Sequence, residues 1–198
     1  IMDQYFKPYP VCRWAQAPIE AVLDLRRSHS LSARNVERIE IESFHECVRL
    51  ATKRPTSTEE AQYSTSFPCA VALVRGTVGV ADIADDALDD KEIIRLSEGL
   101  VMSEDAAANS AFPARRLARA RLYLYDGNVL ESQWHTPRWD AVDPPTDKEL
   151  RDKFYAFSVP VAGQSRANAI EEAINTLPQD GPTMLLELIK RPVEGFQK

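Results

Sequence analysis

The alternation of apolar and polar positions predicts most of the strands in this chain of 198 residues. Residues 117–125 alternate small or aliphatic side chains with arginines and tyrosines, a pattern typical of a strand with one buried face. Asp126-Gly127 follows, and glycine tolerates the positive φ that a tight hairpin turn needs. Residues 129–134 then return as the second strand of the hairpin. Two more strands are predicted at residues 36–44 and 100–104.

Helical spacing dominates the rest of the chain. Residues 15–27 carry one apolar stripe and predict an amphipathic helix, while residues 67–75 are apolar throughout and predict a buried helix closed by Gly76. Residues 82–100 are acidic and helix-prone. Ser57 and Thr146 each precede a glutamate by three residues, the spacing of a capping box, so a helix is expected to begin at each. A further helix is predicted to carry Ile170, Ile174 and Leu177, and residues 183–189 are apolar and belong to the expected helical tail.

Strands that pair out of sequence order, with helices between and after them, favour the α+β class. We predict a two-layer sandwich with a small, mainly antiparallel four-stranded sheet and packed helices. Residues 1–177 are expected to form this domain, and residues 178–198 a C-terminal helical tail. The apolar segments 1–6 and 183–189 have no evident partner within the domain, so we expect them to pack against another domain or subunit.

Composition narrows the class of protein. The 30 acidic residues outnumber the 24 basic ones, which argues against nucleic acid as a partner. The three cysteines (Cys12, Cys47 and Cys69) are far apart in sequence, which favours a reducing compartment and argues against a zinc or iron–sulfur site. No apolar run reaches the roughly 20 residues that cross a bilayer, so we expect no membrane association and a cytoplasmic protein.

The chain opens on a stiff arm, Lys7-Pro8-Tyr9-Pro10-Val11-Cys12. Each proline fixes its own φ and keeps the preceding residue out of the helical region, so the arm is extended. Lys7 is thereby presented just ahead of a helix start. Because Ile1-Met2 is an unusual beginning, we expect the chain to be the back part of a longer protein.

Several motifs then point to one family. In chain order they are the Lys-x-Tyr-Pro-x-Cys arm, Arg54-Pro55 followed by Glu60-Ala61-Gln62-Tyr63-Ser64 and an apolar helix, the Asp126-Gly127 hairpin, and Pro144-Pro145-Thr146-Asp147-Lys148-Glu149-Leu150. Together they resemble the carboxy-terminal domain of the MmgE/PrpD family, from about Phe6 to about Leu177. That family includes 2-methylcitrate dehydratase, cis-aconitate decarboxylase and iminodisuccinate epimerase.

The resemblance implies a two-domain homodimer that acts on small di- and tricarboxylates without a metal or organic cofactor. An N-terminal helical domain, absent from this sequence, would carry most of the catalytic histidines, and the present α+β part would act as a lid over the cleft. The lysine of the opening motif matches Lys7, which becomes the candidate catalytic and substrate-binding residue. Family members often have histidine at the positions of Cys12 or Gln16, and some have tyrosine at that of Phe67.

Each candidate residue also has a plainer interpretation. Lys7 binds a substrate carboxylate or protonates a leaving group, or is simply exposed. Cys12 and Phe67 contact the substrate, or are buried in the core. Gln16 donates to the substrate, or lies on the exposed side of its helix.

The remaining polar side chains are weaker candidates. The histidines (His29, His45 and His135) are expected at the surface or in packing roles. Arg115 and Arg116, just before the hairpin, could attract an acidic substrate.

The leading hypothesis is a fragment of a carbon–oxygen lyase of the 2-methylcitrate dehydratase type, which serves propionate catabolism and is inactive as an isolated piece. The alternatives are an epimerase, isomerase or decarboxylase of a small dicarboxylate in the same family, and a non-catalytic binding module.

Overall fold

The computed structural model describes residues 4–193 and contains two compact units, Ile1–Pro144 and Pro145–Lys198. The division falls between Pro144 and Pro145, two consecutive prolines that interrupt regular structure. The boundary predicted between residues 177 and 178 lies within the second unit. The apolar segment 1–6 is predicted to pack against another domain or subunit. Its first three residues, Ile1 to Asp3, lie outside the described residues.

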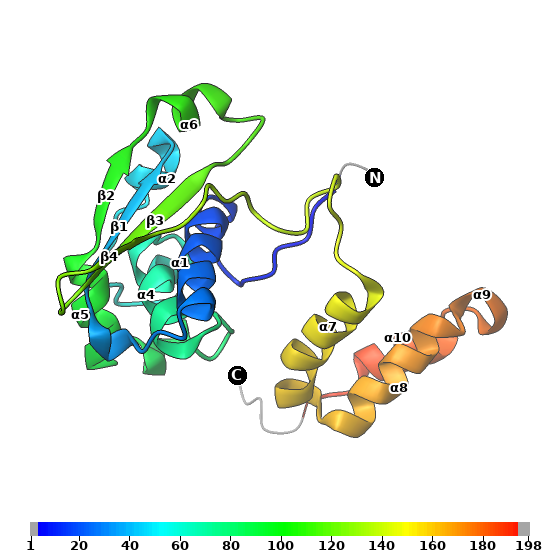
Figure 1. Ribbon diagram of the computed structural model, residues 1–198. Helices are drawn as coiled ribbons and strands as arrows, with labels where there is room; N and C mark the ends of the chain where they lie inside the picture. Colours follow the sequence, from blue (N-terminus) through cyan, green and yellow to red (C-terminus); the bar gives the residue numbers. More distant parts are fainter. Residues whose placement is uncertain (1–3, 194–198) are drawn as a thin grey trace. The chain divides into compact units, whose positions relative to one another are not determined.

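A four-stranded sheet lies on one side of the first unit (Figure 1). Its strands are β1 (Val36–Ser43), β2 (Val101–Glu104), β3 (Ala118–Leu124) and β4 (Val129–Glu131), in the order β2-β1-β3-β4. The β1–β2 pair is parallel, whereas β1–β3 and β3–β4 are antiparallel. The α+β class and the mainly antiparallel four-stranded sheet are therefore confirmed, while the two-layer sandwich stays a prediction.

The two faces of the sheet differ as the alternation predicts. Ile39 pairs with Leu122, and both side chains are fully buried. On the other face Glu42 pairs with Arg119, and its carboxylate accepts hydrogen bonds from Arg119 Nε at 2.5 Å and Arg121 Nη1 at 2.7 Å. One face belongs to the core, and the other carries a network of ion pairs.

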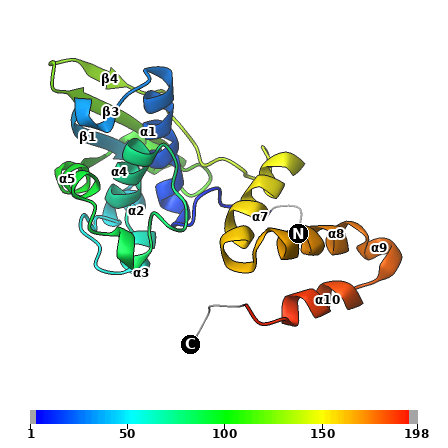
Figure 2. The same cartoon turned by 90° about the horizontal axis from the view of Figure 1, so that it is seen from below.

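Three helices accompany the buried face of the sheet: α1 (Gln16–Ser28), α4 (Ser66–Arg75) and α5 (Lys91–Gly99). Helix α1 packs against β3 and α4, and α5 packs against α4 and β1 (Figure 2). Gly76 ends α4 with φ of 79°, a left-handed conformation that glycine adopts without steric cost.

The acidic stretch 82–100 is less helical than predicted. It contains a 3-10 turn at Asp85–Ala87, and α5 begins only at Lys91, because Asp90 caps the helix by accepting from the amides of Glu92 and Ile93.

Short elements complete the first unit. The predicted start at Ser57 is confirmed, since its hydroxyl accepts from the amide of Glu60. The short elements are α2 (His45–Arg49), α3 (Thr58–Gln62), α6 (Ala106–Ala111) and the 3-10 turns Arg13–Ala15 and Ala33–Asn35.

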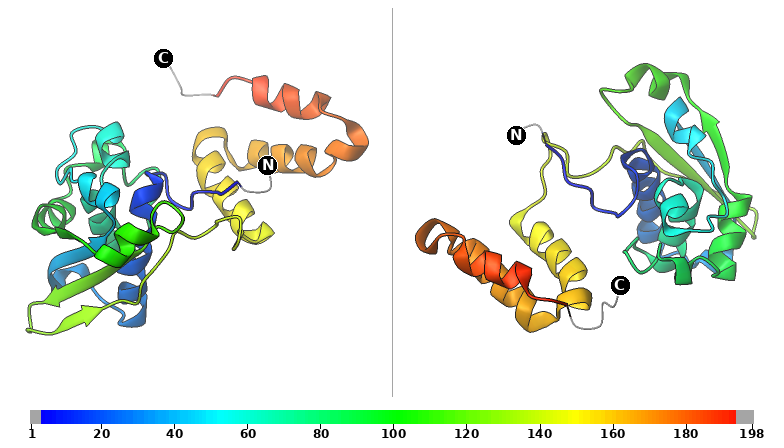
Figure 3. Two further views of the ribbon diagram at one scale, coloured as in Figure 1. Left: turned by 90° about the horizontal axis from the view of Figure 1, so that it is seen from above. Right: turned by 180° about the vertical axis from the view of Figure 1, so that it is seen from behind.

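The second unit is helical. It contains α7 (Asp147–Ala162), α8 (Gln164–Asn175), α9 (Leu177–Asp180) and α10 (Thr183–Lys190), and α8 packs against both α7 and α10 (Figure 3). Thr146 and Glu149 form the predicted capping box at the start of α7. Among residues 4–193, none of the helices combines the length and the apolar character that crossing a bilayer needs.

Candidate functional site

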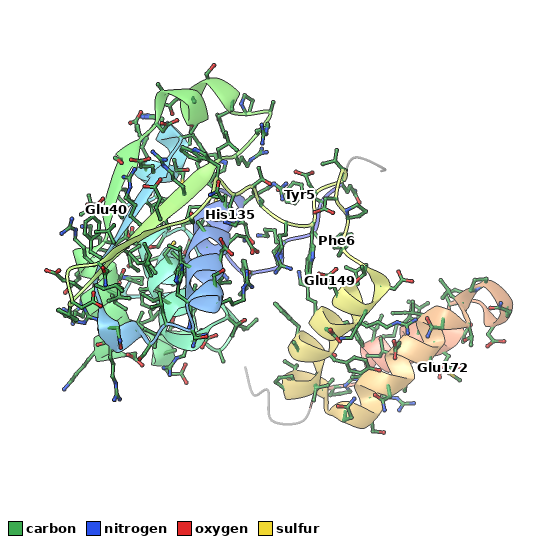
Figure 4. The ribbon with its side chains drawn as sticks, viewed as in Figure 1. Tyr5, Phe6, Glu40, His135, Glu149 and Glu172 are labelled. Atoms are coloured by element: carbon green, nitrogen blue, oxygen red, sulfur yellow. The ribbon has the colours of Figure 1, made fainter. Side chains whose placement is uncertain are left out.

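Backbone hydrogen bonds hold the opening arm (Lys7 to Cys12) to the first unit at two points, one just before Lys7 and one at Cys12. The amide of Phe6 donates to the carbonyl of Trp139 at 3.1 Å, and the amide of Cys12 donates to the carbonyl of Gln62 at 2.8 Å. Lys7 lies between these two anchors and is exposed. Figure 4 shows Tyr5 and Phe6 on the same arm, ahead of α1. The backbone on either side of Lys7 is therefore held in place.

Gln16 holds the arm against the first turn of α1. Its Nε2 donates to the carbonyls of Tyr9 and Val11, each at 3.1 Å, and its Oε1 accepts from the amide of Tyr9 at 3.4 Å. The side chain is fully buried, so the interpretation that Gln16 lies on the exposed side of its helix is wrong. The amide group satisfies backbone atoms of the extended arm that have no partner in a sheet.

A buried ionic cluster lies behind the arm. Glu20 is 3% exposed, and its Oε1 accepts from Tyr9 Oη at 2.8 Å and from Arg138 Nε at 2.6 Å. Burial and the charge of Glu20 raise the pKa of Tyr9, which therefore stays neutral. Although burial alone would lower the pKa of Arg138, the hydrogen bond and charge of Glu20 raise it. This arrangement keeps the Glu20 carboxylate and one neutral phenol inside the unit, while the partly exposed Arg138 supplies the opposite charge.

The family model described as MmgE/PrpD C-terminal domain matches residues 9–179, most of the chain. The chain belongs to the MmgE/PrpD family. No curated protein matches it. The matched range includes Cys12, Gln16 and Phe67 but begins two residues after Lys7, so the match itself does not cover the candidate lysine.

Within this MmgE/PrpD domain, the three predicted site residues have different environments. Lys7 is exposed and Cys12 is half-buried on the same arm. Phe67 is fully buried in α4, within the apolar cluster that also contains Tyr9 and Val11 of the arm. The core interpretation of Phe67 fits this burial, while the substrate-binding roles of all three remain predictions.

The other cysteines of the domain are buried. Burial raises the pKa of Cys47 to about 11 and that of Cys69 well above its usual value, so both thiols stay protonated. Among residues 4–193, no group of three or more His, Cys, Asp or Glu side chains is placed to hold a metal ion.

The histidines of the domain occupy surface or packing positions, as predicted. His45, at the start of α2, has its Nδ1 2.8 Å from Glu104 Oε1, and His135 Nε2 lies 3.3 Å from Asp24 Oδ2 of α1. His29 is exposed just after α1. Two groups of polar side chains near the arm were not predicted from the sequence. They are the Tyr9–Glu20–Arg138 cluster and the ion pair between Arg13 and Asp140. In each group the arginine and its carboxylate partner are more than a hundred residues apart in sequence, and no local pattern connects them.

Proposed function

We propose that this MmgE/PrpD domain is the lid part of a cofactor-independent hydro-lyase of the 2-methylcitrate dehydratase type. Its substrate would be a small di- or tricarboxylate, in a cytoplasmic homodimer that serves propionate catabolism. The domain would be a two-layer α+β structure, and an upstream helical domain would supply the general base. The observation that carries the proposal is the family match over residues 9–179.

The chemistry gives Lys7 a defined role. Dehydration of a hydroxy-tricarboxylate removes a proton next to a carboxylate and expels hydroxide, so negative charge develops on the carboxylate and the leaving oxygen needs a proton. An ammonium group that faces the substrate can bind the carboxylate. In a cleft that excludes water, the same group could also protonate the leaving oxygen.

The anchored arm supports this role. The backbone hydrogen bonds at Phe6 and Cys12, together with those from the Gln16 side chain to the arm, fix the backbone that carries Lys7. A fixed backbone reduces the freedom that must be lost when a flexible side chain is positioned for reaction. The arm can therefore aim one positive charge with little additional ordering.

The intact gene product, assayed with 2-methylcitrate and a panel of hydroxy-tricarboxylates, tests the proposal. Lys7→Ala should lower kcat/KM at least about a hundredfold, while Lys7→Arg retains more activity if carboxylate binding dominates. Lys91→Ala, an exposed lysine at the start of α5, is the control and should leave the rate unchanged. Turnover by the 198 residues alone, or full activity of Lys7→Ala, would contradict the division of roles.

One observation favours a second reaction, the epimerisation or isomerisation of a small dicarboxylate. The positions of Cys12 and Gln16, where dehydratases and decarboxylases of the family often have histidine, carry a thiol and an amide that already bonds the arm. Such a reaction removes the same proton but returns it to the substrate without loss of water. Incorporation of deuterium from solvent with no dehydrated or decarboxylated product would select this alternative.

A further inference from the structure

A short loop that follows the hairpin, residues 138–140, bonds to the opening arm on both sides of the candidate lysine. The Trp139 carbonyl accepts from the amide of Phe6 at 3.1 Å. The neighbouring Arg138 donates from its Nη2 to Tyr9 Oη at 3.3 Å. One bond lies just before the lysine and the other two residues after it. Adjacent residues of loop 138–140 therefore hold both flanks of this position.

Loop 138–140 is in turn tied to the helix behind the arm. Arg138 Nε donates to Glu20 Oε1 of α1 at 2.6 Å, and Asp140 Oδ2 accepts from Arg13 Nη2 at 2.5 Å. Glu20 and Arg13 are 3% and 6% exposed, whereas their partners in the loop are partly exposed. A buried charge without its partner is strongly unfavourable, so these two buried groups hold the loop in one place.

Trp139, between the two ion pairs, has an unfavourable backbone conformation. Its φ is +64°, in the left-handed region that large side chains rarely occupy, and the residue is 8% exposed. Such conformations persist only where the surrounding structure enforces them, and they cluster at functional sites. The flanking pairs provide this constraint, and the carbonyl of the strained residue is the one that accepts from Phe6.

We propose that loop 138–140 and the Tyr9 hydroxyl position Lys7 for reaction, with α1 as their fixed support. Gln16 already bonds the carbonyls of Tyr9 and Val11, so the arm stays attached without that hydroxyl. The hydroxyl adds a link from Tyr9 to the same loop that holds Phe6. Tyr9 and loop 138–140 act through Lys7 and are positioning residues. The inference rests on the proposed role of Lys7 in the hydro-lyase reaction.

The intact gene product with Tyr9→Phe tests the link, because the ring stays and only the hydroxyl is lost. The amide of Phe6 should exchange with solvent at least about fivefold faster in this variant. Tyr123→Phe is the matched control. It removes a tyrosine hydroxyl that donates to Glu40 Oε2 at 2.7 Å on the polar face of the sheet, and should leave the exchange of Phe6 unchanged.

Steady-state kinetics with the substrate that the intact gene product turns over provide the second measurement. Tyr9→Phe should lower kcat about tenfold and change KM less than about threefold, because a misdirected ammonium group is missed mainly in the transition state. In the Lys7→Ala background the same substitution should lower kcat less than about twofold further, since it acts through the missing group. Tyr123→Phe should leave both constants unchanged.

Two results would overturn the inference: unchanged exchange of Phe6 in Tyr9→Phe, or a loss of kcat that persists in the Lys7→Ala background. Full activity of Lys7→Ala would instead contradict the proposed function, and the exchange of Phe6 alone would then decide whether the loop orders the arm.

If Tyr9→Phe does not fold, Arg138→Lys provides the second variant. It keeps the charge that Glu20 needs, but a single amine cannot reproduce the separate guanidinium donors to Glu20 and Tyr9. The amide of Phe6 should therefore exchange faster in this variant too, and unchanged exchange would count against the inference.

Discussion

At the scale of single residues, Gln16 shows where periodicity stops being informative. The apolar stripe of residues 15–27 predicts the helix, and α1 is found at Gln16–Ser28. A stripe identifies only one covered face, so it places Gln16 on the open side. In the structure the arm folds back over that side, and Gln16 is buried because it bonds the carbonyls of the arm. The spacing of apolar residues along a helix cannot show that another segment of the chain folds over its polar face.

Replacing Gln16 by methionine tests how much its hydrogen bonds to the arm contribute to stability. The side-chain volume is nearly kept, while these hydrogen bonds are lost. We expect the free energy of unfolding to fall by about 2–3 kcal/mol, since buried carbonyls lose their donor. Urea denaturation measures the change. Gln133→Met, at an exposed position after β4, should change stability by less than about 0.5 kcal/mol. Equal stability of Gln16→Met and the parent protein would show that the hydrogen bonds between Gln16 and the arm do not stabilise the fold.

The ion-pair face of the sheet gives a pH-dependent prediction at Glu42. Burial alone would raise the pKa of Glu42, but hydrogen bonds from Arg121 and Arg119 outweigh it and hold the pKa below the ordinary value of 4.5. A lowered pKa in the folded state stabilises the protein above that ordinary value, and the gain is lost as pH falls through the folded pKa. Glu42→Gln should therefore cost about 1 kcal/mol at pH 7, and its difference from the parent should shrink as the pH falls below 4.5 and through the lowered pKa of Glu42.

Denaturation curves between pH 7 and pH 3 check this dependence. Glu37→Gln, on the same strand but exposed, is the matched control and should show no such convergence. A penalty for Glu42→Gln that stays constant over this range would mean that packing, not charge, is responsible.

At the scale of elements, the strands and the longer helices follow from the sequence, but several short helices do not, among them α2 and α6 of the first unit. Helix α2 spans five residues and α6 spans six, too few for a helical period to be recognised. Both are stabilised by tertiary contacts, since Cys47 of α2 and Ala108 of α6 join Phe44 in a small second cluster. One local signal was available: the Asp105 side chain accepts from the amide of Ala108 and caps α6.

The end of α4 provides a prediction for Gly76→Ala. Gly76 has φ of +79°, and a Cβ there would lie 2.3 Å from Nη1 of Arg26, whose Nε donates to the carbonyl of Leu73. We expect the variant to lose about 1–2 kcal/mol, because both the left-handed backbone and the position of Arg26 are disturbed. Thermal unfolding measures the loss.

Gly99→Ala is the control for this position. Gly99 is the last residue of α5, and a Cβ there would meet no heavy atom within 4 Å. Alanine has the higher helix propensity, so this variant should be neutral or stabilised by up to about 1 kcal/mol. If Gly76→Ala were as stable as Gly99→Ala, the left-handed cap would not be needed.

At the scale of the whole molecule, the family match and the compact units divide the chain differently. The match runs from residue 9 to residue 179, across the division between Pro144 and Pro145. The proline pair marks this division in the sequence, but the motifs that carry the resemblance continue through it. The division into compact units depends on which residues contact one another in the folded chain. The order of the family motifs along the sequence does not determine those contacts.

Helix α10 leads to a prediction about the intact gene product. Met184, Leu186 and Ile189 are exposed, and an apolar face of this kind is costly to leave in water. If an upstream domain or a second subunit covers it, as we propose, the amides of α10 should exchange at least about tenfold more slowly in the intact protein than in the isolated 198 residues. The amides of α4, buried in both, serve as the control, and equal protection of α10 in the two samples would contradict the proposal.

The strand order has a consequence for how the protein is made. β1 is complete at Ser43, but both of its neighbours come from residues 101–124. During translation the first strand therefore stays unpaired until its first neighbour, β2, is complete at Glu104, about sixty residues after Ser43. Non-local pairing of this kind slows folding and leaves nascent chains open to aggregation. Chaperone dependence of the newborn chain should end once β3 has left the exit tunnel.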